Sequence, residues 1–217
     1  MANAANERFN TVLTVAPYLA WMGLMLALPT AAWAYASRAA VAGALLLAFM
    51  VLEQKTWKIS ASAVAWGVGA GILVCVLWIW PESFDIYRRL FVIGGVPAEA
   101  VSSPYDPAVC GWALTMAKLV GSAFVIAPAE ELFFRSFLYR WIQGDGARID
   151  RFDASAFLWT VALFALEHNR WLAGAMAGAI YGILAIRKGL GSAIIAHATT
   201  NLALGVWVIL RGEWAFW

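Results

Sequence analysis

Charged residues are scarce in this chain of 217 residues: 13% are Asp, Glu, Lys or Arg, whereas 63% are hydrophobic. Soluble domains carry roughly 25% charged residues, so the chain has too few polar side chains to cover the surface of a globule. This shortage argues against a soluble domain. It predicts an integral, multi-pass membrane protein that forms one bundle with the lipid bilayer around it.

Cysteine and clustered basic residues are also scarce. Cys75 and Cys110 are the only cysteines, and both lie in or beside apolar runs, where packing is their expected role. Two cysteines alone cannot form a structural zinc site. The basic residues are scattered and form no patch of the kind that binds nucleic acid, so no nucleic-acid partner is expected.

Long apolar runs are what the sequence does contain. A helix that crosses a bilayer needs about 20 predominantly apolar residues. Strand patterning is absent, so we predict an all-α fold, a polytopic bundle of seven transmembrane spans, or eight if the loop 81–108 contributes one. The run at 11–35 has only a weak basic flank, so we expect a retained span and not a cleaved signal peptide. The predicted spans are 11–35, 39–52, 61–80, 109–140, 154–168, 171–186 and 190–210.

Two adjacent acidic residues, Glu130 and Glu131, lie in the fourth predicted span. One charged side chain near the bilayer centre costs at least ~2.5–3.5 kcal/mol of insertion free energy. Two adjacent glutamates there indicate a structural or functional role that offsets this cost. Glu131 and Arg135 are four residues apart and are expected to form an ion pair on one helix face. Glu130 is turned about 100° away and has no local partner, which leaves it available as a general base. The alternative is that both glutamates only make contacts between helices.

The only two histidines also lie in or at the end of apolar runs. His168 follows Phe164 by four residues where the fifth predicted span ends, and alone it could be an interfacial residue. His197 and Asn201 are four apart in the seventh predicted span and project to the same side. Two hydrogen-bond donors aimed at one point are what an oxyanion needs. Alone, this pair could instead bond the backbone of neighbouring helices.

Small residues recur at helical spacing in two of the predicted spans. Gly174, Gly178 and Gly182 repeat every four residues in the sixth span, and Gly67 and Gly71 do so in the third. This spacing lets the backbones of neighbouring helices approach closely. We therefore expect both spans to pack tightly, and the sixth to bring its neighbours together.

Taken in order, the motifs Glu-Glu-x-x-x-Arg, Phe-x-x-x-His and His-x-x-x-Asn resemble those of the CAAX-processing and bacteriocin-processing (CPBP/Abi) family of glutamic intramembrane proteases. The family includes the eukaryotic prenyl-protein endopeptidases that trim CAAX tails, and the prokaryotic Abi proteins. The resemblance covers roughly residues 109–210. It implies a hydrolase that cleaves a membrane-associated or lipidated peptide or protein, without cofactor or metal, in a prokaryotic inner membrane. It divides the bundle into N-terminal spans with a loop, 1–108, and a catalytic core, 109–217.

The resemblance also assigns roles to the motif residues. Those implied to activate the attacking water are Glu130 and His168. Those implied to hold the oxyanion are His197 and Asn201. The remaining motif positions, which we interpret as structural support, are Glu131, Arg135 and Phe164.

Several other functions stay open. Two histidines and a glutamate could form the zinc site of a metal-dependent membrane protease, although the chain lacks a His-Glu-x-x-His segment. A transporter also uses buried Glu, His and Arg, but no inverted repeat is visible between the halves. A non-catalytic bacteriocin-immunity or scaffold protein would share the fold. The sequence does not indicate whether the substrate is prenylated, nor the oligomeric state.

Overall fold

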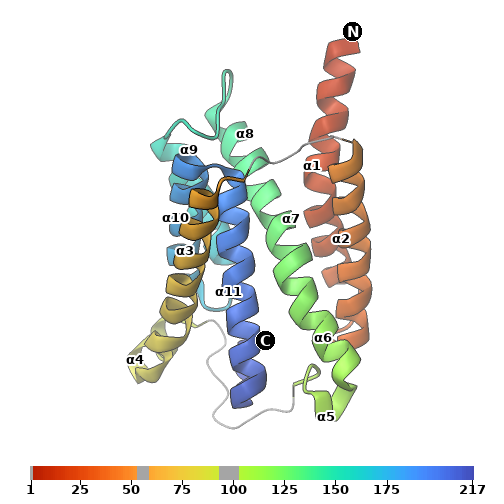
Figure 1. Cartoon of the computed structure of the whole chain (residues 1–217), viewed down its shortest axis with the longest axis vertical. Helices are drawn as coiled ribbons and strands as arrows, with labels where there is room; N and C mark the ends of the chain where they lie inside the picture. The colour runs from red at the N-terminus through yellow and green to blue at the C-terminus, as the bar shows by residue number, and fades with distance from the viewer. Residues whose placement is uncertain (1, 53–58, 93–102) are drawn as a thin grey trace.

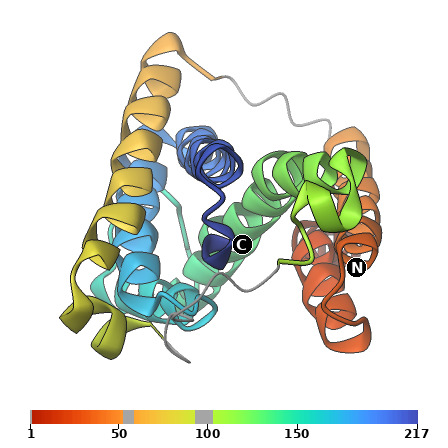
Figure 2. The ribbon, with the colours of Figure 1, turned by 90° about the horizontal axis from the view of Figure 1, so that it is seen from below.

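The computed structural model describes residues 2–52, 59–92 and 103–217, with side chains described from residue 11 onward. Within these ranges the chain is helical and has no strand, which confirms the predicted all-α class. Figure 1 shows α1 and α2 on one side of the molecule, α3 and α9–α11 on the other, and the long helix α6–α8 between them. The same order is visible from below in Figure 2.

The described helical elements differ widely in length, from 26 residues in α1 to three in η4. In order they are α1 (Ala2–Ala27), α2 (Ala32–Leu52), α3 (Ala61–Ile79), η1 (Trp80–Ser83), α4 (Asp85–Phe91), α5 (Pro107–Cys110), α6 (Trp112–Gly121), η2 (Ser122–Ile126), α7 (Ala127–Glu131), η3 (Leu132–Leu138), α8 (Tyr139–Gln143), α9 (Ala154–Leu166), α10 (Trp171–Lys188), α11 (Leu190–Arg211) and η4 (Trp214–Phe216).

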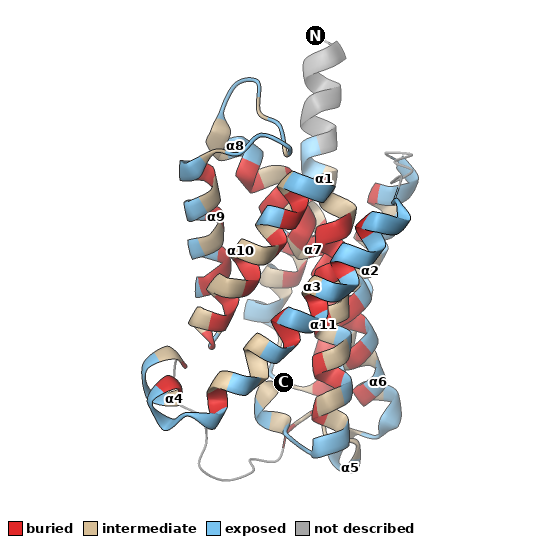
Figure 3. Cartoon of the chain, turned by 60° about the vertical axis from the view of Figure 1, so that its left-hand side comes forward, coloured by how far each residue is buried: buried red, intermediate tan, exposed pale blue. Residues whose placement is uncertain are grey.

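Four of the described helices are long and apolar enough to cross a bilayer, namely 32–52, 61–83, 112–143 and 190–211. Two shorter apolar helices cover 11–27 and 154–166. The predicted number of seven or eight spans therefore stays a prediction. Large apolar side chains face outward on these helices, among them Leu47 and Val51 on α2 and Leu73 and Val76 on α3. Figure 3 shows exposed residues on the outer faces of the helices and buried ones on the inner faces, as contact with lipid requires.

The first predicted span, 11–35, is wrong as a single helix. α1 ends at Ala27, and α2 begins at Ala32. Pro29 lies between them, and proline both lacks a backbone N–H and disfavours a helical residue before it. The predicted second span, 39–52, is correspondingly longer, because α2 takes in the residues from Ala32. The predicted loop 81–108 contains η1, α4 and α5, and its residues 93–102 lie outside the described part.

The helix that carries the two glutamates runs without a break over residues 112–143 and contains two π-helical segments, η2 and η3. At the end of η2, the Ala127 N–H donates to the Ser122 carbonyl, five residues back. Pro128 follows at once, and its ring would meet the carbonyl of residue 124 in a regular α-helix. The wider π turn lies where this clash would occur. The segment α7, with both glutamates, is thus flanked by wide turns.

The small residues of α3 face α11 at close range. A β-carbon on Gly71 would lie 2.5 Å from the Ala196 carbonyl oxygen and 2.6 Å from Thr199 Cβ. A β-carbon on Gly67 would lie 2.8 Å from Ile195 Cγ2. No side chain fits at either position, so the backbones of α3 and α11 touch there, as the glycine spacing predicts. This contact sets the position of α11, which carries the second histidine motif.

Candidate active site

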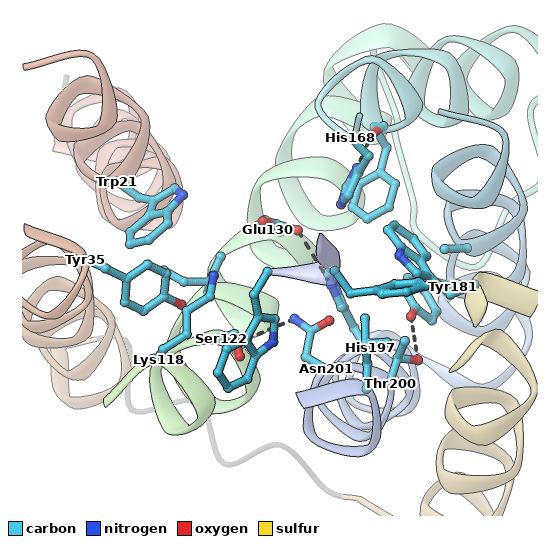
Figure 4. Close-up of a pocket in the computed structure, with 17 residues that line it drawn as sticks. Trp21, Tyr35, Lys118, Ser122, Glu130, His168, Tyr181, His197, Thr200 and Asn201 are labelled. Atoms are coloured by element: carbon cyan, nitrogen blue, oxygen red, sulfur yellow. Dashed lines mark hydrogen bonds and ion pairs between the residues drawn. The ribbon is translucent and has the colours of Figure 1, made fainter. Parts of the chain in front are cut away.

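A cavity of about 230 Å³ lies inside the bundle, between the α1–α2 side and the α3–α11 side. Both halves of the chain line it. Figure 4 shows the four residues with predicted catalytic roles around this space: Glu130, His168, His197 and Asn201. The aromatic part of the wall comes from Trp21, Tyr35, Trp78, Phe164, Tyr181, Phe216 and Trp217.

Glu131 is the most deeply placed acidic residue of the site, with no exposed surface. Its Oε1 atom lies 3.1 Å from Arg135 Nη1, the ion pair that the four-residue spacing predicts. Arg135 also donates from Nη2 to the Gly178 carbonyl on α10, at 3.1 Å, and its guanidinium lies 4.4 Å from the centre of the Phe164 ring. Phe164 is buried, in keeping with a packing role. Arg135 therefore neutralises Glu131 and ties η3 to α9 and α10.

His197, on α11, bridges the two glutamates. Its Nδ1 atom lies 3.0 Å from Glu131 Oε1, and its Nε2 atom lies 3.6 Å from Glu130 Oε2. The ring stacks on Tyr181, with centroids 4.8 Å apart. Because a carboxylate only accepts hydrogen bonds, Glu131 holds the proton on Nδ1 and turns Nε2 towards Glu130. His197 thus contacts both glutamates, a relationship that the motif spacing does not predict.

His168 lies in the turn between α9 and α10, on another wall of the same cavity. Its Nδ1 atom is 2.8 Å from the Phe164 carbonyl oxygen, which can only accept, so this nitrogen carries the proton and Nε2 is the acceptor. The ring packs edge-on against Trp78 of α3, with centroids 5.3 Å apart.

A buried ion pair holds the turn that carries His168. Arg170, two residues later, pairs through Nε with Glu82 of η1. Its Nη1 donates to the Ala215 carbonyl at 3.1 Å, and the guanidinium stacks over the Phe216 ring at 4.2 Å. The turn is thereby anchored to the end of α3 and to the C-terminal segment.

Asn201 lines the cavity one turn after His197, but its amide is partly engaged. Its Nδ2 atom donates to the Ser122 carbonyl at 3.0 Å. The sequence predicts that the donors of His197 and Asn201 point at one site. In the structure this bond joins α11 to η2, so one of the two amide N–H groups of Asn201 remains free to donate to a ligand.

Other wall residues were not found from the sequence. Tyr181, which stacks on His197, donates to Thr200 at 2.7 Å, and Thr200 lies 2.9 Å from the Gly71 carbonyl on α3. No pattern links these three positions, because they come from three helices. Lys118 also lines the cavity, and a lysine inside an apolar run is a signal that the sequence does offer. Tyr35 comes from the half of the chain that carries no motif.

A metal site requires several His, Cys, Asp or Glu side chains close together. In residues 2–52, 59–92 and 103–217, no group of three or more His, Cys, Asp and Glu side chains is placed to hold a metal ion.

Residues 112–203 match the family model described as Type II CAAX prenyl endopeptidase Rce1-like. The match includes all three motifs and confirms the resemblance that they predict. No curated protein and no solved structure matches the chain. Together with the four apolar helices, this match to a membrane-protease family supports an integral membrane protein.

Proposed function

We propose that this chain, whose residues 112–203 match the Rce1-like endopeptidase family, is an intramembrane endopeptidase that cleaves a membrane-associated or lipidated peptide or protein. One observation carries the proposal: Glu130, His168, His197 and Asn201, from three separate segments, line one cavity inside an apolar bundle. Ionisable groups at such a place are costly, and they mark functional sites.

We assign the first step, activation of water, to Glu130 and His168. Glu130 Oε2 is buried and has no hydrogen-bond partner, so it is available to accept a proton from a water molecule in the cavity. The lone pair of His168 Nε2 accepts the second hydrogen of this water and orients it. The water oxygen then bonds to the carbon of the scissile carbonyl, Glu130 takes the proton, and the carbonyl electron pair moves onto its oxygen.

We assign stabilisation of the resulting oxyanion to His197 and Asn201. When His197 carries both protons, Nδ1–H donates to Glu131 and Nε2–H is free for the oxyanion. The charges then balance, because Glu130 is protonated at this stage, and His197 and Arg135 together offset Glu131 and the oxyanion. The second N–H of the Asn201 amide adds a neutral donor. When the intermediate collapses, the C–N bond breaks and Glu130 returns its proton to the leaving amine.

We further propose a division of labour within the chain. Residues 109–217 are the catalytic core, and residues 1–108 complete the wall of the cavity through Trp21, Tyr35 and Trp78. The expected location is a prokaryotic inner membrane, with the lipid bilayer and a peptide substrate as partners.

The deciding experiment compares purified wild-type protein with Glu130→Gln and with Glu213→Gln, an exposed glutamate outside the cavity. Each is incubated with a mixed pool of membrane peptides, with and without a chelator, and products are read by mass spectrometry. Cleavage by wild type and Glu213→Gln, lost in Glu130→Gln and indifferent to chelator, is the expected result. Inhibition by chelator that zinc reverses would instead establish a metal-dependent protease. Cleavage that persists in Glu130→Gln would overturn the glutamate mechanism.

A further inference from the structure

The segment that follows α11 covers one end of the cavity. Two of its residues, Phe216 and Trp217, line the cavity. The Trp217 ring meets that of Tyr105, just before α5, with centroids 6.4 Å apart. The Phe216 ring meets the guanidinium of Arg170, in the turn between α9 and α10, at 4.2 Å. Figure 2 shows the C-terminus between these two sides of the bundle. Residues 214–217, which we call the lid, thus join one wall of the cavity to the other.

The cavity is too small for a peptide while the lid lies in this position. Its volume is about 230 Å³, whereas pockets that hold drug-sized molecules measure roughly 300–1,000 Å³. A peptide of several residues is at least as large as such a molecule, and its scissile bond has to reach Glu130 and His168. Part of the wall therefore has to move before a peptide can bind.

The lid is the part of the wall that is held least firmly. Most other wall residues belong to α1, α2, α3, α10, α11 and the helix over 112–143, which pack along their length. The lid follows Gly212, whose φ of +69° a glycine adopts without strain. In the described part of the chain, one hydrogen bond joins the lid to a segment other than its own neighbour, from Arg170 Nη1 to the Ala215 carbonyl at 3.1 Å. Short segments that end an element, next to such a residue, are common hinges for lids.

Arg170 is fixed independently of the lid that it contacts. Its Nε atom pairs with Glu82 of η1, and each of these two residues is 8% exposed. The Nη1 atom and one face of the guanidinium remain for Ala215 and Phe216. When the lid moves away, Glu82 still offsets the charge of Arg170. Opening therefore breaks one hydrogen bond and a few ring contacts, and it leaves no buried charge unpaired.

We propose that residues 214–217 close the catalytic cavity of the resting protein, that Arg170 holds this lid in place, and that a peptide substrate displaces it on entry. The inference rests on the proposed hydrolytic function and adds control of access to the same site. A closed lid keeps bulk water away from the buried polar groups until a substrate arrives, and its movement admits the substrate and releases the products.

The first test measures access to the cavity and needs no cleavage. Ser122 lines the cavity, so Ser122→Cys places a thiol there once Cys75→Ala and Cys110→Ser have removed the native ones. The rate of its reaction with a charged, water-soluble maleimide is measured in detergent, with the lid intact and with Phe216→Ala/Trp217→Ala. The thiol reacts in proportion to the fraction of molecules that are open, so the lid variant should react about tenfold faster.

Two further variants control this test. Trp141→Ala/Phe152→Ala removes an exposed tryptophan and an exposed phenylalanine that do not line the cavity, and it should leave the rate unchanged. Arg170→Lys keeps a positive charge for Glu82 but loses the planar guanidinium with its Nη1 donor, so the thiol should react faster, as in the lid variant. The melting temperature of each variant establishes that the thiol is probed in folded protein. An equal rate with and without the lid side chains, in folded protein, would overturn the inference.

The second test measures the kinetics of cleavage for a peptide that wild type cleaves. Phe216→Ala/Trp217→Ala should lower KM about tenfold and leave kcat nearly unchanged, because binding no longer requires displacement of the lid. A higher KM would show that these two side chains bind the substrate instead of blocking its entry, and would overturn the inference. If wild type cleaves no peptide, yet the thiol reaction still depends on the lid, the hydrolytic function fails and the lid stands. If cleavage proceeds but the thiol reaction ignores the lid, the lid fails and the hydrolytic function stands.

Discussion

Glu131 Oε1 lies 3.0 Å from His197 Nδ1, so the acidic residue that pairs with Arg135 within its own helix also orients a histidine 66 residues later. One fully buried carboxylate oxygen thus serves two partners from different helices. Glu131 therefore both neutralises Arg135 and positions the ring of His197. It accepts a hydrogen bond from Nδ1 of His197 and so turns Nε2 towards Glu130, as carboxylates orient histidines in other active sites.

Glu131→Gln should lower the rate of cleavage by about 100-fold or more, because a neutral amide no longer offsets the positive charge of His197 in the oxyanion step and can turn its nitrogen instead of its oxygen towards Nδ1. The rate is measured at saturating substrate and expressed per folded protein, since the change also removes the partner of Arg135. The exposed Glu213→Gln is the control and should leave the rate unaltered. A fully active Glu131→Gln enzyme would contradict the orienting role.

Glu130→Gln should abolish cleavage without loss of stability. Removal of a general base costs about 10²–10⁴-fold in rate. Glu130 Oε2 makes no hydrogen bond that the substitution could break, and a neutral amide is easier to bury than a carboxylate. The melting temperature in detergent should therefore be unchanged or higher, as expected where a side chain is kept for activity at a cost in stability. A lower melting temperature with activity retained would show that Glu130 is structural.

Arg135→Met should destabilise the protein by about 3–5 kcal/mol, because it leaves Glu131 buried beside one partner fewer. It also removes the hydrogen bond to the Gly178 carbonyl. Thermal or denaturant unfolding in detergent measures the change, with Arg187→Met, at the exposed end of α10, as the matched substitution. The double variant Glu131→Gln/Arg135→Met should regain part of the lost stability. If Arg135→Met alone has the same free energy of unfolding as wild type, the buried pair of Glu131 and Arg135 does not contribute to stability.

Gly71→Ala should destabilise the contact between α3 and α11, whereas Gly69→Ala on the same helix should not. A β-carbon on Gly71 would lie 2.5 Å from the Ala196 carbonyl oxygen, but one on Gly69 would meet nothing within 4 Å. Overpacking of this kind typically costs about 1–3 kcal/mol. Because α11 also carries His197, the rate of cleavage should fall with Gly71→Ala as well. Equal melting temperatures for the two variants would show that the helices can separate without cost.

Some interpretations of the sequence depend only on local chemistry, and these agree with the structure. The scarcity of charge indicates helices with apolar outer faces, and four of those described are long enough to cross a bilayer. The spacing of Glu131 and Arg135 predicts an ion pair because helical geometry alone places them side by side. The predicted helix bounds were wrong where the effect of a proline was underestimated. Pro29 lies between α1 and α2, so residues 11–35 do not form one helix.

The sequence by itself determined the helical class, the membrane environment and the identity of the motif residues, because composition and helical periodicity are properties of single segments. Only the tertiary structure decided which residues meet. The approach of α3 and α11 at Gly71 places His197 against Glu130, and residues from both halves of the chain line the same cavity. These contacts join residues from helices far apart in the chain, and the packing that creates them is a property of the whole bundle, since no single helix encodes where its neighbour lies.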